Sequence, residues 1–153
     1  MIKYTWGCCF ETKGNRFVRT EKNGFTPIRK VREYEIEVYD ADGGMTVING
    51  KEYHIKKGNV LVVFPGDQRQ SKPDFKCYSL KFLCDDVEFT GKLKEIAGMN
   101  QCEIHEQLIE DIKSIYPLTN EINKEIVTDA KIRTIVAALY ENITLKKRKF
   151  SSI

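Results

Sequence analysis

REYEIEVYDADGGMTVINGKEYHIKKGNVLVVFPGDQRQSKPDFKCYSLKFL, residues 32–83, is a series of short apolar stretches separated by turn residues. Within it, Asn49-Gly50 suits a two-residue hairpin, because both residues tolerate a positive φ angle. Asp42-Gly43-Gly44, Lys57-Gly58 and Pro65-Gly66-Asp67 mark further turns at similar intervals. This pattern predicts short strands that close into a small barrel or sandwich.

The first clear strand runs from Glu33 to Tyr39 and alternates with a period of two. One face carries Tyr34, Ile36 and Val38, and the other carries the three glutamates of the same stretch. We expect the apolar face to be buried and the glutamate row to be solvated. If the row faced inward instead, it could bind hydroxyl groups or a cation.

Two later strands follow in the same region. Val60 to Phe64 is apolar on both faces and stops at Pro65, so we expect one face inside the barrel and the other covered from outside. Lys76 to Leu83 alternates again and predicts a half-buried strand.

After Asp85-Asp86 the apolar residues recur every three or four positions, which predicts amphipathic helices. The three blocks are Phe89, Leu93 and Ile96; Ile104, Leu108, Ile109, Ile112 and Ile115; and Ile126, Ile132, Ile135, Val136, Leu139, Tyr140 and Ile143. Thr128-Asp129 marks either an internal turn or a cap. Strands followed by about three helices predict an α+β fold, mainly β, with the helices packed on the barrel.

We therefore expect a barrel over residues 1–85, a helical part for packing or dimerisation over 86–145, and a basic, linker-like tail over 146–153. The stretch before Pro27 suits an arm or short edge strands. At 153 residues and 41% hydrophobic content, the chain fits one domain with a real core.

Composition limits the possible partners. The net charge of +3 is too small to indicate a nucleic-acid surface by itself. No apolar run approaches the roughly 20 residues that cross a bilayer, so we expect a cytoplasmic protein without a membrane partner. The five cysteines lack a paired spacing and are expected to be reduced thiols, with Cys77 and Cys84 packing as small apolar groups.

The sequence offers little catalytic or metal-binding chemistry. Its two histidines, His54 and His105, are too few for a barrel metal site. No nucleophile with a paired base and no phosphate loop is present, so we expect neither an enzyme nor a cofactor. A barrel with a few convergent polar groups suits a small molecule, and the polar candidates are Arg29, Arg32, Arg69, Gln70, Ser79 and Lys81.

A motif series follows the first strand: the Asn49-Gly50 hairpin, Tyr53-x-Ile55-x-x-Gly58, Phe64-Pro65-Gly66 and Cys77-Tyr78-x-x-x-Phe82. This series resembles the N-terminal sensor domain of AraC-type transcription regulators, from about Arg29 to Leu83 and more loosely to Ile143. The resemblance implies a cupin-like double-stranded β-helix barrel followed by helices. Catalytic cupins carry metal-binding histidines, but the position after the Pro-Gly turn is Arg69 here, so the resemblance implies a metal-free barrel.

The resemblance also implies a binding site for a small-molecule effector. Carried over by position, it would use an arginine before the first long strand, the segment after the Pro-Gly turn, and alternate residues of the last strand. An N-terminal arm would close over the pocket. The implied residues are Trp6, Arg29, Arg32, Arg69, Gln70, Ser71, Cys77 and Ser79. Ser79 stands where sugar-binding relatives offer an aromatic platform, which argues against a sugar ligand.

In that family the last helix of the sensor domain often makes a homodimer contact. Here the matching apolar stripe is Ile132, Ile135, Val136, Leu139 and Ile143, with packing against the barrel as an equal alternative. The family reads DNA through C-terminal helix-turn-helix units, and nothing after Ile143 could form one. DNA binding would therefore need a further domain.

The leading hypothesis is an effector-binding and dimerisation domain of a bacterial AraC-type regulator. One alternative is a small cupin enzyme that acts on a sugar or keto acid, with Glu35 or Lys81 as the acid or base. The other is a ligand-free dimerisation module with a packed barrel.

Overall fold

The computed structural model describes residues 1–12, 19–120 and 123–151. The strands found in these ranges are β1 (Lys3–Glu11), β2 (Arg29–Lys30), β3 (Tyr34–Tyr39), β4 (Met45–Ile48), β5 (Lys51–His54), β6 (Asn59–Val63), β7 (Gln68–Lys72), β8 (Lys76–Leu83) and β9 (Gly98–Gln101). The helices are α1 (Val87–Glu95), α2 (His105–Lys113), the short 3₁₀ helix η1 (Tyr116–Asn120) and α3 (Lys124–Ser151).

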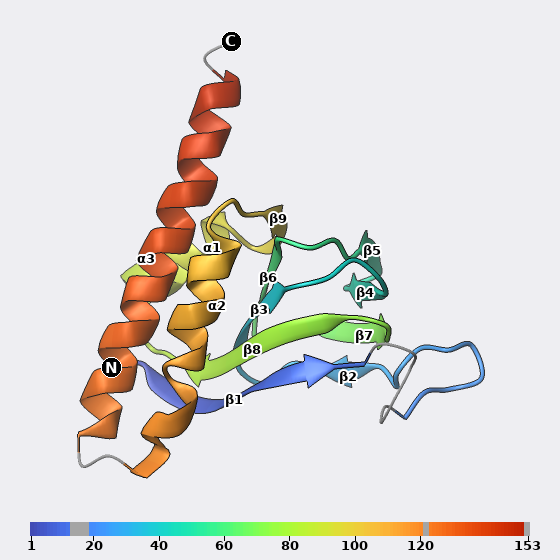
Figure 1. Ribbon diagram of the computed structural model, residues 1–153, viewed down its shortest axis with the longest axis horizontal. Coiled ribbons are helices and arrows are strands. Elements are labelled where there is room, and N and C mark those ends of the chain that lie inside the picture. The colour runs from blue at the N-terminus through green and yellow to red at the C-terminus, as the bar shows by residue number, and fades with distance from the viewer. Residues whose placement is uncertain (13–18, 121–122, 152–153) are drawn as a thin grey trace.

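The strands form two antiparallel sheets that face each other (Figure 1). Sheet A has the order β1-β8-β3-β6-β9, and sheet B has the order β2-β7-β4-β5. Without β9, each sheet has four strands, in the orders β1-β8-β3-β6 and β2-β7-β4-β5. This arrangement is the eight-stranded jelly roll of cupins. The expected fold class, a cupin-like barrel followed by helices, is therefore confirmed.

The predicted Asn49-Gly50 hairpin is present between β4 and β5. Asn49 has a φ angle of 51° and Gly50 one of 83°, and Ile48 pairs with Lys51 across the turn. Two successive positive φ angles match the right-handed twist of the flanking strands. Gly58 and Gly66 also have positive φ angles, as their turn positions require.

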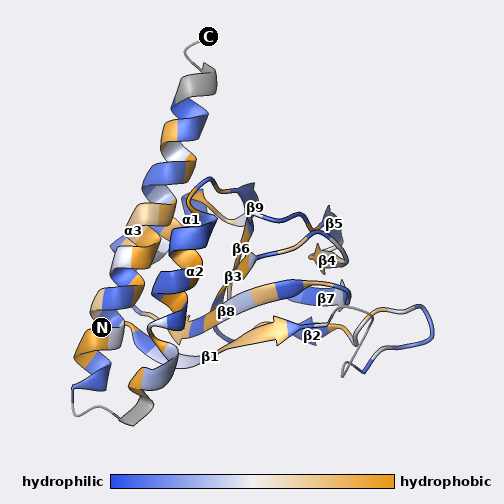
Figure 2. Cartoon of the chain, viewed as in Figure 1, coloured by the Kyte–Doolittle hydropathy of each residue, from blue (hydrophilic) through white to orange (hydrophobic). Residues whose placement is uncertain are grey.

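The helices cover the outer face of sheet A, where they bury the main core (Figure 1). Figure 2 shows apolar and polar residues alternating along α2 and α3, as expected for helices with one buried face. The sheet residues of this core are Ile36, Val38, Val60, Val62, Leu80 and Phe82, and the helix residues include Leu93, Leu108, Ile112, Ile132 and Leu139. Val60–Val63 is buried on both faces, as predicted.

Two expectations about boundaries are corrected. The division at residue 85 is not structural, because β9 lies after it in sequence and pairs with β6 in sheet A. Of the two alternatives for the N-terminal stretch, an arm or edge strands, the structure has an edge strand over residues 3–11, since β1 pairs along β8 at the edge of sheet A. The basic tail over 146–153 is helical as far as Ser151, which ends α3, and its last two residues lie outside the described ranges.

The possible turn at Thr128-Asp129 is also wrong, because α3 runs through it. The Thr128 hydroxyl donates to the carbonyl oxygen of Lys124 at 2.7 Å, one helical turn earlier. Asp129 accepts a 2.6 Å hydrogen bond from the backbone N–H of Ile2 and so ties the start of the chain to α3.

Replacing Gly7 with alanine should destabilise the protein by about 1–3 kcal/mol through overpacking. A Cβ atom at Gly7 would lie 2.7 Å from the ring of Tyr116 and 2.8 Å from the carbonyl oxygen of Ser79. Gly91→Ala is the control, because a Cβ there meets nothing within 4 Å and α1 should gain up to about 1 kcal/mol. Urea unfolding measures both, and equal stability of the two variants would contradict the close packing of η1 on β1.

Candidate functional site: a charged cluster inside the barrel

Glu35 is the centre of a buried ion cluster inside the barrel. Both carboxylate oxygens accept from Arg29, at 2.9 and 3.0 Å. Arg69 donates to the same carboxylate at 2.7 Å, and the Lys81 ammonium lies 3.4 Å from it. These side chains come from β3, β2, β7 and β8, so the cluster joins strands of both sheets.

Glu37, two residues further along β3, completes the cluster. Its carboxylate accepts a 2.9 Å hydrogen bond from Arg69 and a 2.7 Å hydrogen bond from the hydroxyl of Tyr39. Arg69 also donates to the hydroxyl of Thr46 at 3.2 Å, and that hydroxyl lies 3.1 Å from the Ser71 hydroxyl. The buried guanidinium of Arg69 therefore bridges both carboxylates and sheet B.

The glutamate row was expected on the solvated face of its strand, and this is wrong for Glu35 and Glu37. The side chains of Glu35 and Glu37 are only 2% and 8% exposed and face the interior. Tyr34, Ile36 and Val38 point the other way, into the core beneath the helices. The reason is that the helical layer needs an apolar sheet face, and the alternation then places the glutamates inside.

The cluster shifts the pKa values of its members. Burial disfavours ionisation of Glu35, but the hydrogen bond from Arg29 and the charges of Arg69, Arg29 and Lys81 outweigh it and lower the pKa of the carboxyl. Burial likewise opposes the charge on Arg69, and the combined attraction of Glu37, Tyr39 and Glu35 outweighs it and raises the pKa of the guanidinium. Burial and the Glu37 charge raise the pKa of Tyr39, so its hydroxyl stays protonated and donates.

A cavity of about 440 Å³ opens onto this cluster. Its volume falls within the usual range of small-molecule sites. The residues that line it come from β1, β2, β3, β7, β8 and the loops beside them: Phe10, Thr12, Thr26, Pro27, Arg29, Glu37, Arg69, Gln70, Ser71, Phe75 and Lys81. We call this space the barrel pocket.

Four of the residues implied by the resemblance line the barrel pocket, namely Arg29, Arg69, Gln70 and Ser71. Cys77 and Ser79 are fully buried, on the inner face of β8, but do not line it. The Ser79 hydroxyl has no hydrogen-bond partner among the residues that the structure describes.

The other two implied residues lie outside the pocket lining. Arg32 is exposed and is not part of the lining. Trp6 lies within β1 and not on a closing arm. The Lys81 ammonium is 4.9 Å from the centre of its indole ring, and the ring of Phe10 is 5.4 Å away.

Sequence reasoning missed Glu37, Phe10 and Phe75 as pocket residues and assigned the glutamates to the wrong side. A signal for the charged pair was present, since two acidic residues, Glu35 and Glu37, alternate on β3, while Lys81 lies on the neighbouring strand β8 and Arg69 on β7 of the facing sheet. Phe10 and Phe75 carried no such signal. They lie far from β3 along the chain, so the sequence does not show that they line the same pocket.

The apolar stripe of α3 that was expected at a dimer contact is buried in the core of the single chain. Ile132, Ile135, Val136, Leu139 and Ile143 are at most 3% exposed and belong to the core beneath sheet A. They have no surface left for a second copy. The structure therefore agrees with the alternative, in which the stripe packs on the barrel. A dimer would have to use other residues.

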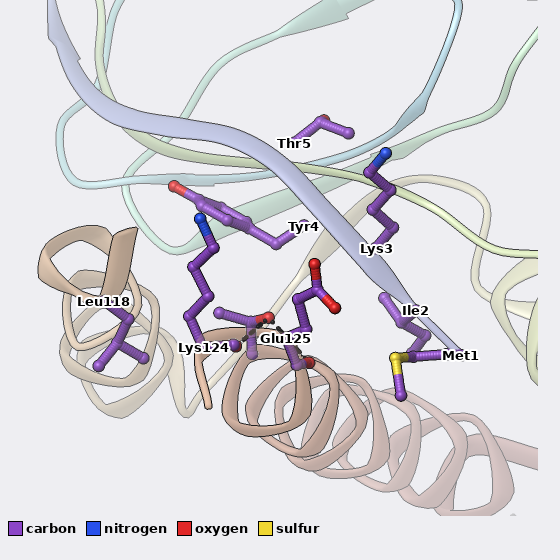
Figure 3. Close-up of a pocket in the computed structure, with 9 residues that line it drawn as sticks. Met1, Ile2, Lys3, Tyr4, Thr5, Leu118, Lys124 and Glu125 are labelled. Atoms are coloured by element: carbon purple, nitrogen blue, oxygen red, sulfur yellow. Dashed lines mark hydrogen bonds between the residues drawn. The ribbon is translucent and has the colours of Figure 1, made fainter. Parts of the chain in front are cut away.

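A second cavity of about 510 Å³ lies between the start of β1, η1 and the first turns of α3 (Figure 3). Its surface includes Lys3, Lys124 and Glu125, all exposed. The buried Thr128 hydroxyl already donates to helix carbonyl groups. The described residues of this lining include no converging buried charges like those of the barrel pocket.

Among the described residues, no group of three His, Cys, Asp or Glu side chains could hold a metal ion. No helix within those residues is long and apolar enough to span a bilayer.

No family model matches the chain, and no curated protein matches it significantly. Solved structures do match. The AraC-like transcriptional activator CuxR has a TM-score of 0.52 at 14% identity, over 74% of this chain and 43% of that chain. A predicted oxalate decarboxylase from Thermotoga maritima has a TM-score of 0.36 at 22% identity, over 39% and 56%. The plu4264 protein from Photorhabdus luminescens has 0.34 at 14%, over 57% and 83%.

The chain is thus similar in fold to part of an AraC-like activator, and it spans less than half the length of that protein.

Arg69→Met should destabilise the fold by about 3–5 kcal/mol, because two carboxylates would remain buried without their shared cation. Arg32→Met is the control, since this exposed arginine should matter by less than about 0.5 kcal/mol. Adding Glu35→Gln and Glu37→Gln to Arg69→Met should recover much of the loss. Chemical unfolding measures all three, and a loss at Arg69 no larger than at Arg32 would show that the cluster is dispensable.

Stability should fall in acid because of Glu35. Its folded pKa lies below the ordinary value of 4.5, so its ionised form stabilises the fold above that value. The contribution disappears as the pH falls through the folded pKa. In unfolding experiments from about pH 7 to about pH 3, Glu35→Gln should lose less stability than the unmodified protein. Parallel curves for the two proteins would contradict this assignment.

Proposed function

We propose that this chain is the effector-binding domain of an AraC-type transcription regulator and that the barrel pocket binds the effector. One observation carries the proposal: a cavity of small-molecule size opens onto a built cluster of charged groups inside the barrel. The likeness in fold to an AraC-like activator supports the family assignment. DNA binding would belong to a further domain of such a regulator.

Binding fits this site better than catalysis. A general acid must hold a proton at the working pH, whereas the surrounding cations lower the pKa of Glu35. A general base must be free to accept one, but Glu35 already contacts Arg29, Arg69 and Lys81. The small-enzyme alternative named these residues, and their mutual pairing argues against it.

The proposed signal passes through β1. Phe10, near one end of this strand, lines the barrel pocket. The other end contacts the helices, because Ile2 donates to Asp129 of α3. Between them, the Tyr116 hydroxyl of η1 lies 3.0 Å from the carbonyl oxygen of Cys8. An effector with different affinity for two positions of β1 would therefore bias the helices as well.

We propose that the domain acts as a homodimer, as such regulators need for paired DNA half-sites. The contact would use exposed surface and not the buried stripe of α3. Sedimentation equilibrium measures the mass, and a monomer at all accessible concentrations would remove this part of the proposal.

A thermal-shift screen with sugars, amino acids, organic acids and nucleotides tests the sensing function. We expect at least one class to raise the melting temperature. The shift should shrink in Phe10→Ala, which removes part of the pocket wall, and persist in Val87→Ala, whose parent side chain is 82% exposed on α1. Failure of every class, or an equal shift in both variants, would overturn the assignment of the barrel pocket as the sensor site.

A further inference from the structure

We infer that the barrel pocket selects an organic anion with one negative charge and a flat apolar body, such as an aromatic carboxylate. This inference rests on the proposed function and deepens it, because it names the chemical class of the ligand. Three features support it: the charge balance of the cluster, the exposure of its cations, and the aromatic residues that line the pocket with them.

The cluster has one positive charge in excess. Within the part of the chain that the structure describes, Arg29, Arg69 and Lys81 face two carboxylates, Glu35 and Glu37. The other ionisable groups on the inner face do not restore the balance. Burial raises the pKa values of Cys8, Cys77 and Tyr39, so these groups are neutral near pH 7. A ligand with one negative charge would bring this part of the interior to neutrality.

The excess charge is at the accessible side of the cluster. The side chains of Arg29 and Lys81 are 45% and 22% exposed, whereas those of Glu35 and Glu37 are 2% and 8% exposed. A molecule that enters the pocket therefore meets cations before carboxylates. An anion is attracted at this point, while an ammonium ligand is repelled by the nearer charges.

Lys81 has N–H donors available to bind the carboxylate of a ligand. An ammonium group has three N–H donors, and among the described residues the contacts of Lys81 are the carboxylate of Glu35 at 3.4 Å and the face of the Trp6 ring. Arg29 is held more firmly, because one N–H of each terminal nitrogen atom donates to Glu35 at 2.9 and 3.0 Å. The ligand carboxylate would thus bind Lys81, with Arg29 contributing its charge.

Part of the pocket lining is apolar and aromatic. Phe10 and Phe75 line it together with Pro27. Trp6 and Phe10 form an exposed aromatic pair on β1, 40% and 38% exposed, beside Lys81. Flat faces of this kind suit a ring in the ligand, because aromatic stacking adds to the gain from apolar burial.

The test compares ligands of equal shape and different charge. Benzoate and naphthalene-2-carboxylate are titrated by calorimetry against their amides and against benzylamine. We expect each acid to bind roughly tenfold or more tightly than its amide, no binding of the amine, and weakening of the acids but not the amides by added salt. If neither acid binds more tightly than its amide, the inference is overturned.

Variants then locate the contact. Lys81→Met should remove the preference for the acid, and Lys81→Arg should keep it because the charge remains. Lys30→Met is the matched control, since Lys30 is exposed and does not line the pocket. Unfolding curves without ligand verify that each variant is folded. An acid preference that survives in Lys81→Met would overturn the role of Lys81 and with it the inference.

The two proposals fail in different ways. A neutral sugar that binds as tightly as any acid, and loses affinity in Phe10→Ala, would overturn the anion preference and leave the sensor function standing. Absence of binding by every class of the wider screen would overturn the sensor function itself.

Discussion

The ion cluster around Glu35 and Arg69 is the constraint on which the interior of this barrel depends. Ions buried away from water are costly, and their mutual attraction offsets this only when every partner is in place. Here four strands of two sheets each supply a partner, so the cluster exists only when the sheets face each other in this register. The site is therefore assembled by the fold and held ready without a ligand.

The main apolar core and the proposed binding site lie on opposite faces of sheet A. The larger apolar core lies outside the barrel, between the sheet and the helices. The interior holds the charged cluster and a smaller apolar group that includes Tyr39, Leu61 and Val63. Because the helices provide most of the apolar burial, the barrel can keep polar groups and a cavity inside.

Local chemistry in the sequence predicted much of this fold. The Asn49-Gly50 turn, the alternation of β3 and the change of period after residue 85 depend on neighbours along the chain, and each was found. The helix after Asp86 begins with a cap that the sequence analysis did not name, in which the Asp86 side chain accepts from the Phe89 N–H.

What failed depends on contacts between distant residues. A period of two separates Glu35 from Ile36 but does not say which face is inside, and the helical layer decides this. Pairing of β9 with β6, and convergence of Phe10 with Phe75, likewise follow from topology. The resemblance pointed to Arg29 and Arg69, which line the barrel pocket, because a known fold already contains that topology. It also pointed to Cys77 and Ser79, which lie on the inner face of β8 but do not line the pocket.

The placement of β9 has a practical consequence for dissecting this protein. A fragment cut after residue 85 would keep the sequence motifs of a barrel. However, β6 would lose β9, one of its two paired strands, and sheet A would lose its helical cover. An unpaired strand edge beside a bare apolar face invites edge-to-edge aggregation. The smallest piece that can remain dispersed in water must therefore extend past β9 and into α3.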